Sequence, residues 1–312
     1  MNQMPFFEQE KPLNEWDAES SRHALDDLFK ATFAYRKSQE FYELLQFIAK
    51  FHFYSPYNAF LIRTQRPGAT YVAPSYRWFR DFGRRVKPNA NPIVILQPMG
   101  PVMFVFDVSD TEPLPDAKPL PIEVTNPFKV RKGTVNKELE WAIENCKRDG
   151  IKIYYHKTGS QAAGFIKSIT GNRSSETLKF QIGIKDKKPI YESFSVNYEI
   201  CLKDDSDNNI REENYATLVH ELAHLYCGHL GTLNKKWWPD RRGLPHVVEE
   251  FEAESVSYLV CNRLGIETPA DEYLSGYIKN EDKLPRLSLE CIMKAAGLIE
   301  QMSCKRMIIR KN

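Results

Sequence analysis

The chain has 312 residues, enough for one large domain or two ordinary ones, and its 42% hydrophobic and 27% charged residues are typical of a soluble globular protein. The formal net charge of +2 indicates no class of partner, and neither a membrane span of about 18 apolar residues nor a signal peptide can be recognised. The six scattered cysteines form no C-x-x-C pair, which argues against a zinc ribbon or a disulfide framework and predicts a reducing, cytoplasmic location.

The first half of the chain is predicted to begin with helices and to continue with strands. After a flexible lead, the spacing of apolar residues predicts a helix between Trp16 and about Phe53. A second helix opens near Pro56, because proline is tolerated in a first helical turn. Three short runs rich in β-branched and aromatic residues then predict strands: "TYVAP", "NPIVILQP" and "VMFVFDV".

Residues 109–128 contain five prolines and are the best linker candidate. After them, "NKELEWAIENCKRDG" predicts a helix that ends at Gly150. Strands are predicted at "IKIYYHK", "GFIKSIT" and "YEICLK", and helices at about 212–228, 246–264 and 287–304. The predicted fold class is α+β, with an N-terminal α/β domain over residues 1–130 and a C-terminal domain over residues 131–312.

The stretch "TLVHELAHLYCGHL" holds His220, Glu221 and His224 in the order H-E-x-x-H. Residues four apart share one helical face, so both imidazoles can aim at one ion with Glu221 beside it. Zn²⁺ suits two imidazoles and a carboxylate and keeps a fourth position for water, whose proton an adjacent glutamate can take and pass to a leaving amine. The spacing predicts a zinc peptidase site with Glu221 as general base. The alternative is a pair of histidines on an ordinary packed helix.

A strand is also expected just before this helix. The run "FSVNYEICLK" precedes it by about ten polar residues. We expect this strand to lie at the edge of its sheet, where it could hold an extended peptide by adding it as a further strand. A peptide substrate is thus predicted to lie along it.

The nearest third histidine, His229, is out of register for a ligand. The metzincin pattern H-E-x-x-H-x-x-G-x-x-H requires glycine at 227 and histidine at 230, and this chain has Cys227 and Leu230 there. Gly228 is expected to end or bend the helix, which places His229 near its C-terminus, where a cation is favoured.

The third ligand is therefore sought in "HVVEEFEAESVSYLVC", residues 246–261. On a helix, Glu250 and Glu254 share one face with small residues, and the H-E-x-x-H helix has a matching small face. Two small faces let the helices approach closely, so we predict Glu250 as the third zinc ligand. Glu254, one turn later, is predicted to orient a ligand histidine. The alternative is a solvated acidic helix start, which the helix dipole favours.

The segments "HELAHLYCGH" and "EEFEAESVSYLV" together resemble the ImmA/IrrE-type zinc metallopeptidases. They resemble more closely the C-terminal domain of ArdC-type antirestriction proteins, in which an H-E-x-x-H helix is followed by an E-E-x-x-A-E segment. The residues that match that segment are Glu249, Glu250, Ala253 and Glu254. The resemblance implies a zincin-like (gluzincin) domain with a small sheet, the Zn²⁺ ligands and base named above, and a protein or peptide substrate. It also implies a role in antirestriction or in phage and plasmid defence.

The N-terminal half resembles the single-stranded DNA-binding domain of ArdC-type proteins in its order of elements, at "SPYNAFLI", "TYVAPSYRWF" and "GRRVKPNANPIVIL". From Arg63 to Lys87 there are seven Arg or Lys and one acid, Asp81, with aromatic residues interleaved. Cations can follow phosphates while aromatic faces stack on unpaired bases. The alternative is a basic surface helix whose aromatic residues belong to the core, and Trp78 and Phe82, four residues apart, fit either interpretation. The predicted nucleic-acid-binding residues are Arg63, Arg66, Tyr76, Arg77, Trp78, Arg80, Arg84, Arg85 and Lys87.

Two main functional hypotheses follow. The first is a zinc metallopeptidase coupled to a single-stranded DNA-binding domain, with no membrane partner. The second is a DNA-binding or DNA-protecting protein whose zinc is structural or not needed for catalysis. A regulator-cleaving protease without DNA contact is a third. Between the two metal helices, "KKWWPDRRGLPH" is either a lid carrying Trp237 and Trp238 or a packed surface loop.

Overall fold

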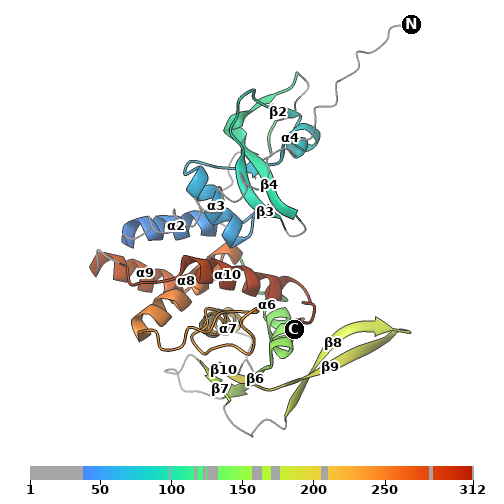
Figure 1. The fold of residues 1–312 in the computed structure, drawn as a ribbon, viewed down its shortest axis with the longest axis vertical. Helices are drawn as coiled ribbons and strands as arrows, with labels where there is room; N and C mark the ends of the chain where they lie inside the picture. The colour runs from blue at the N-terminus through green and yellow to red at the C-terminus, as the bar shows by residue number, and fades with distance from the viewer. Residues whose placement is uncertain are drawn as a thin grey trace.

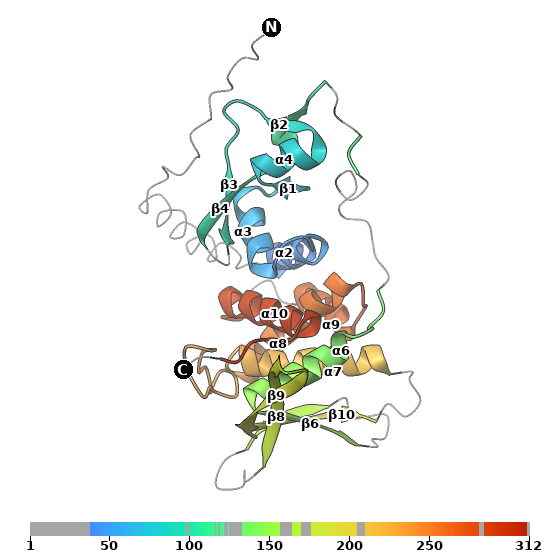
Figure 2. The same cartoon turned by 90° about the vertical axis from the view of Figure 1, so that its right-hand side faces the viewer.

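The structure is a computed structural model. It describes residues 38–97, 100–115, 117, 119–121, 124, 133–156, 164–169, 176–204, 210–280 and 284–310, with the side chains of 100–101 and 278–280 left out. These residues form a mixed α+β fold, with small sheets in the N-terminal part and a mainly helical C-terminal part. Figures 1 and 2 show the elements in layers, from the small N-terminal sheets through several tiers of helices to a C-terminal sheet.

The described N-terminal part starts with two helices, and Ser55 caps the second by accepting a hydrogen bond from the backbone N–H of Asn58. A three-stranded antiparallel sheet has the order β1-β4-β3, and β2 pairs with β5 in a separate antiparallel ribbon. The elements are α2 Ser38–Lys50, α3 Pro56–Gln65, β1 Val72–Ala73, α4 Ser75–Phe82, β2 Arg84–Val86, β3 Ile93–Gln97, β4 Gly100–Asp107, η1 Val108–Asp110 and β5 Thr111–Pro113.

The predicted linker over residues 109–128 is partly a strand. Residues 111–113 form β5 and pair with β2, and the proline comes last in β5, at Pro113. A terminal position is one where a strand tolerates proline. Val124 is buried against Trp78 and its neighbours. Residues 116, 118, 122–123 and 125–128 of the predicted linker, and the first part of the helix predicted from Trp16, lie outside the described residues.

Helices α2 and α3 share one hydrophobic core with the C-terminal helices. The rings of Phe41 on α2 and Phe251 on α8 (His246–Leu264) have centroids 5.6 Å apart. Arg263, also on α8, donates to the backbone carbonyls of Ile48 and Tyr54, at 2.7 and 2.5 Å. The division into domains 1–130 and 131–312 stays a prediction, and the core crosses that boundary.

The C-terminal part places a three-stranded sheet below its helices (Figure 2), in the order β6-β10-β7. Strand β10 is parallel to β6 and antiparallel to β7. The elements are α6 Glu138–Cys146, η2 Lys147–Asp149, β6 Ile151–His156, β7 Phe165–Ser168, β8 Thr177–Lys185, β9 Lys188–Ser195, β10 Tyr198–Lys203, α7 Arg211–Tyr226, α8, α9 Pro269–Asn280 and α10 Leu289–Cys304.

The prediction of an edge strand at "FSVNYEICLK" is wrong. Its first residues end β9, and the remainder is β10, the central strand of its sheet. The physical reason is visible in β10 itself, where Ile200, Cys201 and Leu202 are consecutive and all buried. Such a continuous apolar run is typical of a strand that is covered on both faces. The edge strand next to α7 is β7 instead.

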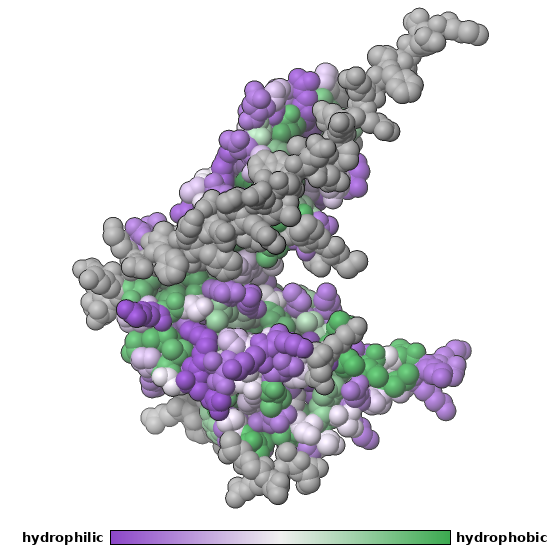
Figure 3. Space-filling model, viewed as in Figure 1, coloured by the Kyte–Doolittle hydropathy of each residue, from purple (hydrophilic) through white to green (hydrophobic). Residues whose placement is uncertain are grey.

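Strands β8 and β9 form a hairpin that projects from the body of the molecule (Figure 1). Its two-residue turn is Asp186–Lys187, and both residues have positive φ, as the twist of a tight hairpin requires. The hairpin carries exposed apolar side chains along its length, while its tip is polar (Figure 3). These apolar residues are Ile182, Ile184, Ile190 and Tyr191. Neither this hairpin nor α9 was among the predicted elements.

Asp149 holds a buried network that ties the end of the chain to the body. Its carboxylate accepts hydrogen bonds from Arg148 at 2.8 and 3.1 Å, from Arg310 at 2.7 and 2.9 Å, and from the Tyr226 hydroxyl at 2.9 Å. Burial opposes its charge, but the hydrogen bonds from Arg310 and Arg148 hold the pKa of Asp149 below its usual range. Residues 305–310 are thereby fixed to the body by a charged anchor.

We expect Asp149→Asn to lower the free energy of unfolding by about 3–5 kcal/mol at neutral pH, because two guanidinium groups lose their buried counter-ion. The carboxylate stabilises the fold above the pKa of an unfolded aspartate, and that stabilisation is lost as pH falls through the lower folded pKa. Urea unfolding at neutral pH and near pH 3 should therefore show a difference between wild type and variant that shrinks in acid. The exposed Asp204 offers the same substitution as a control; equal losses at both positions would contradict the prediction.

No helix in the described part of the chain combines the length and the apolarity needed to cross a bilayer.

Candidate metal centre

Helix α7 carries the H-E-x-x-H residues on the side that faces α8. Glu212 and Glu213 lie in its first turn, where the helix dipole favours negative charge. The helix ends before Gly228, whose φ of 88° lies in the left-handed region. A Cβ there would lie 2.4 Å from the carbonyl oxygen of Pro239, so glycine is required on two counts.

Small residues let α7 and α8 approach closely. Ala223 and Cys227 on α7, and Ala253 and Ser257 on α8, are all buried. A cleft of about 570 Å³ opens beside this contact. The edge strand β7 contributes Phe165 to its lining, and both metal helices contribute charged and imidazole side chains.

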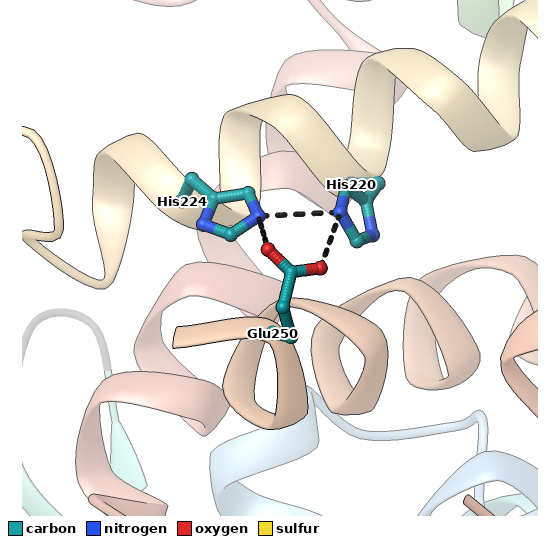
Figure 4. Close-up of side chains that lie close together, drawn as sticks. All are labelled: His220, His224 and Glu250. Carbon is teal, nitrogen blue, oxygen red and sulfur yellow. Dashed lines mark hydrogen bonds and ion pairs between the residues drawn. The ribbon is translucent and has the colours of Figure 1, made fainter. Parts of the chain in front are cut away.

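Three side chains converge in this cleft (Figure 4). The Nε2 atoms of His220 and His224 are 3.2 Å apart. One oxygen of Glu250 lies 3.4 Å from His224 Nε2, and the other lies 3.7 Å from His220 Nε2. Ligand atoms about 2.0–2.2 Å from a tetrahedral zinc ion lie about 3.3–3.5 Å from one another. The His220–His224–Glu250 cluster is therefore a candidate metal site whose spacing and donor types fit Zn²⁺.

Burial keeps the two histidines in the form that binds metal. It lowers the pKa of His220 to about 4 and that of His224 to about 3, and the neighbouring imidazoles add to both shifts. Neutral imidazoles present a nitrogen lone pair to a cation. Two such lone pairs facing each other and a carboxylate repel one another unless a proton or a metal ion lies between them.

Glu221 lies next to this cluster without being part of it. Burial raises the pKa of Glu221 to about 7, opposed by a hydrogen bond from the Ile166 backbone and helped by the charge of Glu250. Ile166 belongs to the edge strand β7, so the strand that borders the cleft also contacts the predicted base. A carboxyl group with a pKa near neutrality is suited to exchange protons at physiological pH.

Glu254 and His246 lie on opposite sides of the cluster. Glu254 Oε1 is 3.6 Å from Nδ1 of His220, the nitrogen that faces away from Glu250. Burial, with the charge of Glu250, raises the pKa of Glu254 to about 7. His246 Nδ1 lies 3.4 Å from Glu250 Oε1, and its side chain is largely exposed. The predicted orienting role of Glu254 stays a prediction.

The segment over residues 235–246, which carries the two tryptophans, is packed and is not part of the lining of the cleft. Trp238 is buried and donates its indole N–H to the carbonyl of Gly231 at 2.8 Å. The guanidinium of Arg310 lies over both tryptophan rings, 5.6 Å from the centroid of Trp237 and 5.2 Å from that of Trp238. The packed-loop interpretation therefore describes this segment.

The predicted nucleic-acid-binding cations lie in the N-terminal part, and most contact acids or backbone oxygens. Arg66 forms an ion pair with Asp110 at 2.5 Å, and Arg85 forms one with Glu112 at 2.5 Å. Both acids lie beyond residue 87, so the fold brings counter-ions to the basic stretch that its own sequence does not contain. Three other cations donate to backbone carbonyls: Arg63, Arg84 and Lys87.

Helix α4 divides the predicted aromatic residues between core and surface. Trp78 is fully buried and donates its indole N–H to the carbonyl of Phe106 at 2.9 Å. Its ring face is not accessible to a base, so Trp78 is removed from the predicted set. Tyr76 is 60% exposed, and the guanidinium of Arg80 lies 5.8 Å from its ring centroid. Arg77 and Arg80 both pair with Asp81.

No family model matches the chain. An uncharacterized protein of Bacillus anthracis is 26% identical to it over 79% of this chain and 44% of the relative's own length, so the chain spans less than half of that protein. Among solved structures, the chain is similar to the antirestriction ArdC protein from plasmid R388. The metal-free structure matches with 14% identity and a TM-score of 0.31, covering 80% of this chain and 82% of that one. The Mn(II)-bound structure matches with 12% identity and a TM-score of 0.35, covering 91% and 95%.

Proposed function

We propose that the chain is a zinc-dependent metallopeptidase in which His220, His224 and Glu250 hold the ion and Glu221 is the general base. The observation that carries the proposal is the convergence of three potential ligand side chains in an open cleft, with contacts of 3.2–3.7 Å between them and a further carboxyl group beside them. A bound Zn²⁺ would acidify a water molecule and polarise a peptide carbonyl. A role in antirestriction or in phage and plasmid defence, implied by the resemblance of the two metal segments, belongs to this proposal.

The residues around the ion divide the remaining work. Glu221 accepts a proton from water in the cleft and delivers it to the leaving amine. Glu254 orients His220 through its Nδ1 atom. Among the described residues, β7 pairs with a strand on one side only, so its other side is the place for an extended peptide. Phe165 and Ile166 of β7 line the cleft beneath such a peptide.

The test is a digest of a peptide library by the zinc-loaded chain, by the chelated chain and by the chelated chain with zinc restored. We expect new peptide termini in the first and third reactions only, read by mass spectrometry. Cleavage that survives chelation would show a contaminating or metal-independent activity. A fully zinc-loaded chain that cleaves no peptide would favour the second hypothesis, in which the zinc is structural.

Binding of single-stranded DNA is a second candidate function, and the exposed face of α4 favours it. Tyr76 and Phe79 are 60% and 64% exposed. Arg80, one turn after Tyr76, places its guanidinium 5.8 Å from the centroid of the Tyr76 ring. Exposed aromatic rings beside a cation form the kind of surface on which unpaired bases stack. Arg85 on the neighbouring β2 extends the cationic surface.

If a base stacks on this face, we expect Tyr76→Ala to weaken binding of a labelled single-stranded oligonucleotide by about 1–3 kcal/mol, measured by fluorescence anisotropy at low salt. Tyr191→Ala is the matched control, because Tyr191 is an exposed tyrosine on the projecting hairpin. Equal affinities for wild type and both variants would exclude stacking on α4. If the wild-type chain binds no single-stranded oligonucleotide at low salt, the proposed DNA-binding function is wrong.

A further inference from the structure

A line of buried polar contacts runs from His224 away from the metal site. The Nδ1 atoms of His224 and His229 are 3.0 Å apart, and His229 Nε2 lies 3.0 Å from Glu252 Oε2. Arg241 closes the line with two bonds of 2.5 and 2.7 Å, one to each oxygen of Glu252. The backbone N–H of Ser288 also donates to Glu252, at 2.7 Å. Glu252 is fully buried and His229 nearly so.

The hydrogen-bond directions along this line are determined by its charged end. Arg241 only donates, and its two bonds require Glu252 to be an ionised acceptor. His229 Nε2 must therefore carry the proton of the His229–Glu252 bond. A neutral imidazole has a single ring proton, and the bond to Glu252 places that proton of His229 on Nε2. Its Nδ1 is then an acceptor.

The same logic determines the tautomer of His224. Only one proton can lie between the two Nδ1 atoms, and since His229 Nδ1 accepts, His224 Nδ1 donates. The remaining nitrogen of His224, Nε2, then bears a lone pair. That nitrogen is the one 3.2 Å from His220 Nε2 and 3.4 Å from Glu250.

We propose that His229 and Glu252 form a hydrogen-bond relay that holds His224 in the tautomer and orientation needed to bind the metal. In this proposal His229 is a positioning residue and not a ligand, and Arg241 keeps the relay charged at its far end. The proposal rests on the metal site described under Proposed function. With the relay, each proposed ligand histidine is oriented by a carboxylate. His220 faces Glu254 directly, and His224 is linked to Glu252 through the imidazole of His229.

The backbone around Gly228 builds the relay into the fold. The N–H of His229 donates to the carbonyl of His224 at 3.0 Å, which folds His229 back against the last turn of α7. Arg241 donates to the carbonyls of Gly228 and Cys227, at 2.9 and 3.0 Å. These bonds hold the loop after α7 against the helix end and place the guanidinium beside Glu252.

A second metal site is the competing interpretation, because Cys227, His229 and Glu252 also lie close enough to share an ion. Both oxygens of Glu252 already accept bonds from Arg241, whose positive charge would oppose a cation there. Burial raises the pKa of the Cys227 thiol well above its usual range. The relay accounts for the positions of His229 and Glu252 without an ion.

The experiment compares zinc affinity, by competition with a chromogenic chelator, in wild type, His229→Leu and His229→Asn. Leucine fills the space without hydrogen bonds, whereas the asparagine carbonyl oxygen can take the place of Nδ1 and accept from His224. We expect His229→Leu to weaken zinc binding by about 10–100-fold and His229→Asn to restore most of it. The cobalt-loaded proteins should show an altered visible spectrum for His229→Leu only. Thermal unfolding of the metal-free variants checks that each is folded.

Equal zinc affinity in all three proteins, with Glu250 still required, would overturn the relay and leave the proposed metal site intact. A wild type that binds no zinc would overturn the metal site and the relay together. A thiolate-to-cobalt charge-transfer band that disappears in Cys227→Ser would instead show an ion held by Cys227 and His229, which also overturns the relay. Weakening by His229→Leu together with rescue by His229→Asn supports it, because a purely steric role would not distinguish the two.

Discussion

Glu250→Ala should remove stable zinc binding, whereas Glu249→Ala should leave it unchanged. Glu250 is the only carboxylate of the three-residue cluster, with its two oxygens 3.4 and 3.7 Å from the two ligand nitrogens. Structural zinc sites bind with roughly 10–16 kcal/mol shared among four ligands, so the loss of one ligand costs on the order of 3 kcal/mol, or at least about 100-fold in affinity. Glu249 lines the same cleft and is the matched control for charge and position.

Metal content after dialysis, measured by mass spectrometry of the elements, checks this prediction. The variant Glu250→Ala with His246→Ala is a necessary companion, because His246 Nδ1 lies 3.4 Å from Glu250 Oε1 and is placed to replace the lost ligand. Zinc that persists in the single variant but not in the double variant would identify His246 as that substitute. Equal zinc in wild type and in both variants would refute the ligand assignment.

Glu221→Gln should keep the zinc and lose peptide hydrolysis by about 10²–10⁴-fold. Glutamine preserves the size of the side chain and can still accept the hydrogen bond from the Ile166 backbone, but it cannot accept a proton. Because Glu221 is not one of the three ligand residues, the ion should remain. The loss is therefore expected in kcat and not in metal content.

The control for this variant is Glu249→Gln, the same chemical change elsewhere in the cleft. Both proteins are loaded with zinc and assayed on a peptide that wild type cleaves. Loss of hydrolysis in both would point to a general effect of cleft charge, and unchanged hydrolysis in Glu221→Gln would show that another group is the base. Biological function that survives Glu221→Gln but not charge reversal at Arg84 and Arg85 would favour the DNA-binding hypothesis.

Much of the metal site could be predicted because it depends on local spacing. The four-residue period places His220 and His224 on one face, and α8 begins and ends where its pattern predicts, from His246 to Leu264. Glu250 was predicted as a ligand from the small residues that let the two helices approach, and the structure brings all three side chains together. These inferences needed only the geometry of single helices.

The sequence could not indicate pairings between distant segments. The apolar run of β10 is typical of a buried strand, but it does not identify β6 and β7 as the neighbours of that strand. The basic stretch from Arg63 to Lys87 contains one acid, but two acids from outside it, Asp110 and Glu112, form ion pairs with its arginines in the fold. His229 was excluded as a ligand by its register, and only the fold shows that it contacts Glu252, some 23 residues further along.

Two consecutive residues of α8 contact different parts of the molecule. Glu250 reaches the metal cluster, and Phe251 packs its ring against Phe41 of α2. Successive residues on a helix project about 100° apart, so the directions of these two side chains change together when the helix rotates. A rotation of α8 that loosens the contact with α2 also swings the carboxylate away from the histidines. We therefore expect the position of Glu250 relative to the two histidines to depend partly on a helix from the other half of the chain.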